Sequence, residues 1–193
     1  MKNNRSGQAT TFTALEYLNI RKQYSSYKHK LLLDIGWYTG ERWGAIIQLL
    51  VADVYTSQGK AKDYITFRAA TRKATPDGKR TTRQVPVNSN LKDILNQYPV
   101  SPNSLWLFPG RNEANHIHFR TCEYIFKKAV ANAGLGNKGI STHSTRRSLI
   151  TNLNEKGIGI KTIQKITGHQ DIRSLIRYID ISEDKIKGAL EQI

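Results

Sequence analysis

Apolar side chains recur at helical spacing through most of the chain, which predicts a mostly helical domain. Three helices are predicted before residue 52. The first is opened by Thr13 and Glu16, whose order and spacing match a capping box. The apolar faces of the next two are formed by Tyr27, Leu31, Ile35 and Tyr38 in one, and by Trp43, Ile46, Ile47 and Leu50 in the other.

The pattern changes between residues 63 and 87. Two short runs, DYITFRAAT and TTRQVPV, are rich in β-branched and aromatic residues, and the stretch TPDGK between them contains the turn formers Pro, Asp and Gly. These features predict an antiparallel hairpin. The expected fold class is therefore α+β, mostly helical, with a small antiparallel sheet.

The helical pattern returns after the hairpin. Asn90 is placed to cap a short helix, and the segment SLWLFPG beyond that helix is expected to form an edge strand or a loop. A long helix then begins near Phe119 and stops at Gly134. Three more helices are expected over about 142–156, 160–167 and 171–180, and a last one over about 184–192.

The length of 193 residues fits one domain, which we assign to residues 12–193 after a flexible N-terminal segment at residues 1–11. No apolar run reaches the roughly 18 residues of a membrane span, and the polar start lacks the apolar region of a secretory signal. The single cysteine, Cys122, is expected in the core and cannot form an internal disulfide. These features predict a cytoplasmic protein.

The charge balance narrows the class of partner. The chain has 30 Lys and Arg residues against 15 acidic residues, a net charge of +15. Between residues 60 and 83 there are eight basic and two acidic residues, a local net charge of +6. Such an excess favours nucleic acid as partner, ahead of an acidic membrane surface or ribosomal RNA. A basic surface that only maintains solubility is the alternative.

One charged side chain points toward the core. In the stretch STHSTRRSLITNL, Thr142 is a plausible N-cap, and Arg146 projects into the same sector of the helix as the apolar residues Leu149, Ile150 and Leu153. His143 lies just beyond the edge of that sector. Because a buried guanidinium is costly without a partner, Arg146 requires either a carboxylate from the core or an anionic ligand.

Arg42 and Tyr178 each flank an apolar face without occupying its centre. Arg42 begins the helix that carries Trp43, and Tyr178 lies at the edge of the stripe formed by Ile172, Leu175, Ile176 and Ile179. This position suits a side chain that lines a cleft. It also suits an ordinary boundary residue, so each of them alone leaves both interpretations open.

Four motifs stand in a characteristic order: TGER at 39–42, HSTR at 143–146, TGH at 167–169, and Tyr178 nine residues after His169. Together they resemble the signature of the tyrosine recombinases, also called phage integrases, over about residues 12–186. The resemblance implies the catalytic fold of that family. It also implies an enzyme that acts on double-stranded DNA as a site-specific recombinase or integrase.

The resemblance assigns a role to each matching residue. Arg42 and Arg146 would hold the nonbridging oxygens of the scissile phosphate, since guanidinium groups match phosphate geometry. Tyr178 would attack the phosphorus, form a 3′-phosphotyrosyl bond and release a 5′-hydroxyl. An ordinary phenol has a pKa of about 10, so the attack needs help with proton removal. His143 would handle that proton, and His169 would hydrogen-bond the phosphate or the surroundings of the tyrosine.

The family also takes a general acid from a lysine of the hairpin. The best match is Lys73, and Lys79 is the rival. The proposed chemistry uses no metal, ATP or other cofactor, because the arginines supply positive charge and the tyrosyl linkage keeps the energy of the broken bond. His116 and His118 form an HxH pair that could bind metal, but a third ligand is not evident.

The chain departs from the family pattern at three positions. Ala45 replaces a usual Glu, Arg147 stands where a second histidine is common, and Thr167 replaces a Leu. Members of the family usually carry a further N-terminal helical domain, for which this sequence has no room. We therefore expect either an excised catalytic domain or a protein that grips DNA with half a clamp.

The resemblance further predicts a bacterial, phage or plasmid origin and a tetramer assembled on two paired DNA sites. The C-terminal stretch EDKIKGALEQI would dock on a neighbouring protomer or pack on its own domain. Two other functions remain open. One is a type IB topoisomerase that relaxes DNA, and the other is a catalytically silent basic protein that only binds DNA.

Overall fold

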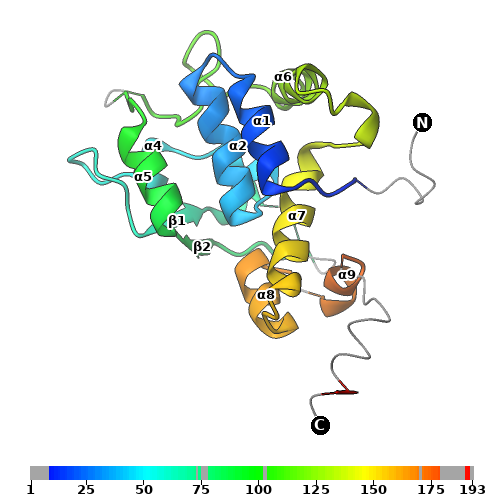
Figure 1. Cartoon of the computed structure of the whole chain (residues 1–193). Coiled ribbons are helices and arrows are strands. Elements are labelled where there is room, and N and C mark those ends of the chain that lie inside the picture. The colour runs from blue at the N-terminus through cyan, green and yellow to red at the C-terminus, as the bar shows by residue number, and fades with distance from the viewer. Residues whose placement is uncertain are drawn as a thin grey trace.

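The computed structural model describes residues 9–72, 74, 78–101, 104–169, 171–178 and 190–191 (Figure 1). In chain order, the elements are α1 (Ala14–Lys22), α2 (Tyr27–Thr39), α3 (Trp43–Ile46), α4 (Val51–Val54), β1 (Tyr64–Phe67), the 3₁₀ turn η1 (Ala69–Thr71), β2 (Arg83–Pro86), α5 (Ser89–Gln97), α6 (Phe119–Asn132), the 3₁₀ turn η2 (Gly136–Lys138), α7 (Thr142–Glu155), α8 (Ile160–Thr167) and α9 (Ile172–Ile176). The predicted fold class, mostly helical α+β with a small sheet, is confirmed.

The two strands form the predicted antiparallel hairpin. Tyr64 pairs with Pro86 and Phe67 pairs with Arg83 at the two ends of the ladder. Ile65, Phe67 and Val85 point into the core, as expected for a hairpin with one buried face. The register therefore places the end of β1 and the start of β2 side by side, next to the loop that joins them.

The main core lies between the hairpin and the helices α1, α2, α3, α5 and α6, with α2 at its centre (Figure 1). Cys122 on α6 is buried there, as predicted. α2 also contacts α7, so the helix that carries the HSTR motif rests directly on the most buried helix of the domain.

A second, smaller core lies among α7, α8 and α9. Ile150, Ile163 and Leu175 are its buried members, one from each helix. In Figure 1, α7 runs from the main body to this smaller unit, so that it contacts α2 and also contributes Ile150 to the second core. Tyr178 packs against this second core.

Of the three predicted N-caps, Thr13 is confirmed, and the other two are wrong by one or two residues. The cap of α5 is Asn88 rather than Asn90, because the side chain of Asn88 accepts a hydrogen bond of 2.9 Å from the amide of Leu91. The cap of α7 is Ser141 rather than Thr142, since Ser141 has an extended backbone and its amide donates to the Ser144 hydroxyl at 3.0 Å.

The helix predicted from Trp43 to Leu50 is also wrong in length, because α3 ends at Ile46. Leu50 has an extended backbone and pairs with Trp106 in an isolated bridge, and its amide donates to the Asp53 carboxylate at 2.9 Å. Leu50 thereby caps α4 instead of continuing α3. Trp43, Ile46 and Ile47 are buried, whereas Leu50 is only half-buried, so the pattern identified the core face but not the break.

Two of the helices predicted near the C-terminus correspond to α8 and α9. α8 has the predicted bounds, and the described part of the following helix runs from Ile172 to Ile176. Ile176, which was predicted to face the core, is 51% exposed. The helix predicted over 184–192, with its docking role, lies outside the described residues except for positions 190 and 191.

No helix in the described ranges is long and apolar enough to cross a membrane.

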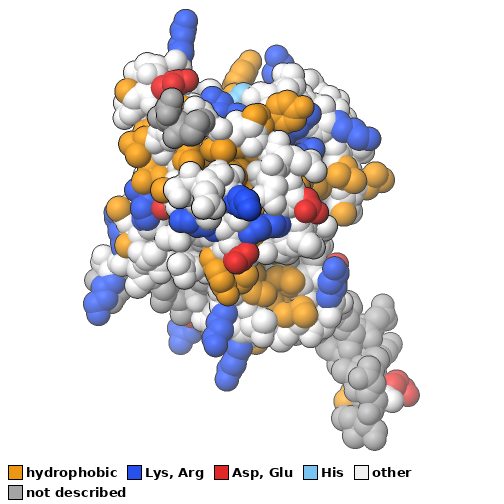
Figure 2. All heavy atoms as spheres, turned by 90° about the vertical axis from the view of Figure 1, so that its left-hand side faces the viewer, with side chains coloured by type: hydrophobic (Ala, Val, Ile, Leu, Met, Phe, Trp, Pro, Cys, Tyr) orange, Lys and Arg blue, Asp and Glu red, His pale blue; other side chains and the backbone are white. Residues whose placement is uncertain are grey.

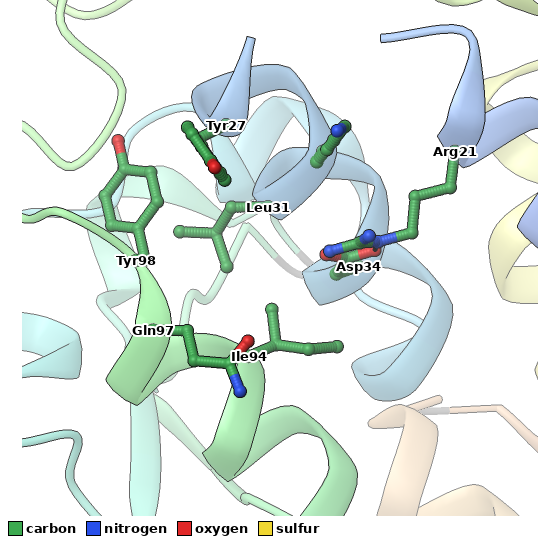
Figure 3. Close-up of a pocket in the computed structure, with 8 residues that line it drawn as sticks. Arg21, Tyr27, Leu31, Asp34, Ile94, Gln97 and Tyr98 are labelled. Atoms are coloured by element: carbon green, nitrogen blue, oxygen red, sulfur yellow. Dashed lines mark hydrogen bonds and ion pairs between the residues drawn. The ribbon is translucent and has the colours of Figure 1, made fainter. Parts of the chain in front are cut away.

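A buried carboxylate joins α1 to α2. Asp34 is fully buried and accepts hydrogen bonds from the Tyr17 hydroxyl at 2.6 Å and from Nε and Nη2 of Arg21 at 2.7 and 2.9 Å. Figure 3 shows Arg21 reaching across to Asp34 at one side of a small hollow of about 50 Å³, whose other wall is formed by α5. Every oxygen of the carboxylate is thus satisfied by a donor from α1.

We predict that Asp34→Ala lowers the free energy of unfolding by about 3 kcal/mol, because it leaves Arg21 and the Tyr17 hydroxyl without their shared acceptor. Urea denaturation measures the change. Asp63→Ala is the matched control, since Asp63 pairs with Lys92 on the surface and its side chain is 87% exposed. Equal losses in the two variants would contradict the prediction.

Candidate active site

Arg146 is the buried centre of the site. Its side chain is only 3% exposed on α7, as the helical pattern predicted. Nη1 donates to the carbonyl of Gly40 at 2.8 Å, and Nη2 lies 3.1 Å from Nε2 of His169. Nε has no hydrogen-bond partner within the described part of the chain. The guanidinium is therefore held by neutral groups rather than by a hydrogen-bonded carboxylate.

Gly40 is the C-cap of α2, and this position brings its carbonyl oxygen to Arg146. Its backbone is left-handed, with φ of 60°, and its amide closes the helix on the carbonyl of Gly36 at 3.1 Å. A Cβ at this position would lie 2.7 Å from Leu149 on α7. A glycine is thus required both by the backbone angle and by the close approach of the two helices.

His169 follows α8 at a second left-handed glycine. Gly168 has φ of 65°, and the amides of Gly168 and His169 both donate to the carbonyl of Gln164. The side chain of Gln164 donates in turn to the carbonyl of His169 at 3.0 Å. This double closure fixes the turn, so the imidazole is directed back toward α7.

The hydrogen bonds around His169 indicate its tautomer. The hydroxyl of Thr167 donates to the carbonyl of Ile163 at 2.7 Å, so its oxygen is free to accept from Nδ1 of His169, which lies 2.7 Å away. Nε2 then carries the lone pair that faces Arg146. Burial, together with the positive charges of Arg146, Arg42 and Arg83, lowers the pKa of His169 to about 3.

Tyr178 lies beside His169 at the edge of the smaller core. The two ring centroids are 5.8 Å apart, and the guanidinium carbon of Arg147 lies 5.7 Å from the centroid of the tyrosine ring. Arg147 and Thr167, two of the three departures from the family pattern, therefore both contact residues of the site. Ala45, the third, is buried in the main core.

Arg42 and His143 complete the group. Arg42 is the N-cap of α3, with an extended backbone, and not a residue of its first turn. Burial and the nearby charges of Arg42 and Arg83 together lower the pKa of Arg146 to about 10, although Glu41 and Tyr178 act in the opposite direction. Burial also lowers the pKa of His143, as do the charges of Arg42 and Arg146. Arg42 and Arg146 thus act on both histidines, and Tyr178 acts on Arg146, so five of the six predicted site residues form one electrostatic group.

An open hollow of about 400 Å³ lies next to these residues. Its lining includes two of the predicted site residues and one of the departures, and the full set is Ala9, Ser141, His143, Arg147, Ser174, Arg177 and Tyr178. Three of these side chains carry a hydroxyl group, and two are arginines. The predicted nucleophile, Tyr178, and the predicted proton acceptor, His143, thus line the same hollow. The two arginines make its wall basic.

Glu41 is a part of the site that the sequence analysis missed. It is 1% exposed, and its carboxylate lies 2.6 Å from Nη1 of Arg83 and 3.7 Å from Nε of Arg72. The same carboxylate accepts a hydrogen bond of 2.9 Å from the amide of Arg42. The only available signal was its position inside the TGER motif, which says nothing of a partner forty residues away.

The remaining candidates lie elsewhere or outside the described residues. Lys73 lies outside them, and Lys79 is exposed in the loop of the hairpin. His116 hydrogen-bonds the carbonyl of Ile117 through Nδ1, and His118 caps α6. Within the described ranges no group of three residues could hold a metal ion.

The surface is basic on the side seen in Figure 2. Lys and Arg side chains stand out around the edge of this face, and acidic side chains are sparse. Positive charge also predominates within the site, where Glu41 is the one acidic residue among the charges that act on Arg146. Both the surface and the site are therefore suited to polyanions.

The comparisons agree with the motif pattern. A family model described as the phage integrase family matches residues 10–185. The tyrosine recombinase XerD of Brucella suis biovar 1 is 28% identical over 111 residues, which make up 54% of this chain and 36% of that protein. The chain thus matches little more than a third of the length of this curated relative.

Two solved structures have the same fold. The crystal structure of XerA recombinase matches with a TM-score of 0.73 and 19% identity, over 96% of this chain and 66% of that one. The XerH site-specific recombinase, bound to its difH substrate in a pre-cleavage complex, matches with a TM-score of 0.69 and 18% identity, over 97% of this chain and 56% of that one. Because the family model covers nearly the whole sequence, this chain belongs to the phage integrase family of tyrosine recombinases.

Proposed function

We propose that the chain is the catalytic part, residues 12–193, of a site-specific recombinase that cleaves and rejoins double-stranded DNA through a 3′-phosphotyrosyl intermediate. The observation that carries the proposal is the buried Arg146, which lacks a hydrogen-bonded carboxylate among the described residues and stands against His169, with Tyr178 beside that histidine. A buried cation of this kind needs an anion at close range.

The scissile phosphate is the anion that suits this site. Arg146 and Arg42 bind its nonbridging oxygens and offset the negative charge that develops as the fifth oxygen approaches phosphorus. The unpartnered Nε of Arg146 provides one donor for this purpose. The DNA-bound structure of the related XerH recombinase supports duplex DNA as the partner.

Tyr178 is the nucleophile. Its oxygen bonds to phosphorus while the bond from phosphorus to the 5′-oxygen breaks, so one ester replaces another and the energy of the phosphodiester is conserved. Arg147, which lies over the ring, favours the developing phenolate by its positive charge. No ATP or other cofactor is required for this exchange.

The two histidines act as neutral acceptors, His143 of a proton and His169 of a hydrogen bond. The lowered pKa of His143 leaves its imidazole uncharged at neutral pH, so it can accept the phenolic proton. His169 stays neutral and fixes the guanidinium of Arg146 by hydrogen bonding. A hairpin lysine, Lys73 or its rival Lys79, protonates the departing 5′-oxygen.

The assembly proposed is a tetramer on two paired DNA sites, in the cytoplasm of a bacterium that carries the chromosomal, phage or plasmid gene. Small molecules and membranes play no part in it. Because the chain matches only part of its relatives' length, the proposal covers strand cleavage and rejoining by this domain, and site choice is left to the full DNA interface.

We predict that Tyr178→Phe abolishes the covalent DNA adduct, because the variant lacks the oxygen that forms the ester. The assay incubates protein with nicked suicide substrates that cover many candidate sites and detects a denaturation-resistant adduct on a gel. Tyr124→Phe is the matched control, since Tyr124 lies exposed on α6. Wild-type protein that forms no adduct would instead support a silent DNA-binding protein.

The products separate the two enzymatic functions. A recombinase joins strands from two differently labelled duplexes, whereas a type IB topoisomerase relaxes a supercoiled circle without exchanging partners. We expect joined products whose formation depends on Tyr178. Relaxation in the absence of any joined product would contradict recombination while leaving the tyrosyl chemistry intact.

We predict that the DNA-free protein loses stability as the pH falls from about 6.5 toward 4.5, in part through His169. Its folded pKa of about 3 lies below the unfolded value, so in this window the unfolded chain binds the proton and the folded chain does not. One such group contributes a slope of up to about 1.4 kcal/mol per pH unit. His169→Gln should reduce the slope by a comparable amount in urea denaturation, and an unchanged slope would contradict the assignment.

A further inference from the structure

The carboxylate of Glu41 joins the TGER motif to both arms of the hairpin. It lies in the TGER motif, it receives the amide of Arg42 on Oε1 at 2.9 Å, and it receives Nη1 of Arg83 on Oε2 at 2.6 Å. Nε of Arg72 lies 3.7 Å from the same Oε2. Arg83 begins β2, and Arg72 directly follows η1, so both partners belong to the arms of the hairpin.

The two arms are also bound to each other at this level. Nη1 of Arg72 donates to the carbonyl of Thr81 at 2.8 Å, and Nη1 of Arg80 donates to the carbonyl of Ala70 at 3.2 Å. The chain between Arg72 and Thr81 contains both candidate lysines. Glu41 therefore holds the base of the loop from which a lysine must reach the leaving group.

The two hairpin arginines also lie against the turn that carries His169. A Cβ on Gly168 would lie 2.8 Å from Cδ of Arg83 and 3.1 Å from Nη2 of Arg72, so the hairpin arginines press directly on the backbone of this turn. Burial lowers the pKa of Arg83, and the charges of Arg72 and Arg42 act in the same direction. Glu41 opposes that effect, and without its charge these guanidinium groups would repel one another in a buried space.

We propose that Glu41 is a positioning residue for DNA cleavage, which holds the hairpin through Arg83 and Arg72 so that a hairpin lysine can protonate the departing 5′-oxygen. The inference rests on the proposed function and names a residue that acts through others. Glu41 does not touch the substrate. It sets the distance between the hairpin and the phosphate held by Arg42 and Arg146.

The chemistry of the leaving group provides a specific readout. In the natural reaction the 5′-oxygen takes a proton from the lysine ammonium as its bond to phosphorus breaks. If a sulfur atom replaces that bridging oxygen, a thiolate leaves instead, and a thiolate needs no proton because a thiol has a pKa of only about 8.5. A defect in hairpin position is therefore relieved by the sulfur substrate, and a defect in phosphate binding is not.

The test measures single-turnover adduct formation by the wild type, Glu41→Gln, Arg83→Met and the double variant on matched oxygen and sulfur substrates. We expect Glu41→Gln to cleave the oxygen substrate about 100-fold more slowly, the size of effect that a small displacement of a catalytic group produces. On the sulfur substrate it should be nearly as fast as the wild type. Glu155→Gln is the matched control, because Glu155 is exposed at the end of α7.

The double variant controls for a loss of folding. It removes Arg83 together with Glu41, so neither charge is left buried without the other. Its rate on the oxygen substrate should be no lower than that of the slower single variant, because both changes break one connection. Equal slowing of Glu41→Gln on both substrates, or losses that multiply in the double variant, would overturn the inference. If the wild type forms no adduct on either substrate, the proposed function itself is overturned.

Discussion

The organisation of this domain depends on the burial of a positive charge. Arg146 is enclosed by α2, α7 and the turn after α8, and its hydrogen-bond partners there are a backbone carbonyl and an imidazole. Neutral acceptors orient a guanidinium but do not cancel its charge. Both left-handed glycines and the buried Thr167 serve this arrangement, because they bring the carbonyl and the imidazole into place. The cost of the unbalanced charge is what suits the site to an anionic ligand.

One carboxylate, that of Glu41, offsets part of the positive charge around Arg146. Arg42 and Arg83 act on Arg146, Arg72 acts in turn on Arg83, and Glu41 is the carboxylate that pairs with Arg72 and Arg83. A carboxylate in direct contact with Arg146 would satisfy it permanently and would compete with phosphate. By pairing with the hairpin arginines instead, Glu41 lowers the repulsion between the segments while leaving the central guanidinium available.

Periodicity was enough to predict much of this structure. The inward direction of Arg146 follows from its place among apolar residues on one helix, and the capping box at Thr13 is present as expected. Local ambiguity explains the misplaced caps, since Asn88 and Asn90 are equally good cap residues two positions apart. The pairing of Glu41 with Arg83 could not be predicted, because it spans 42 positions and involves one of eight basic residues in a charged segment.

The division into two cores gives the parts of the site different rigidity. Arg42 and Arg146 are anchored by elements that pack on the large core, while Tyr178 rests on three buried side chains contributed by α7, α8 and α9. A unit with so few buried contacts opens at a lower free-energy cost than the rest of the fold. Tyr178, which we propose as the nucleophile, thus rests on the smaller of the two cores. In the proposed reaction, Tyr178 could then move with α8 and α9 while Arg42 and Arg146 stay in place on the larger core.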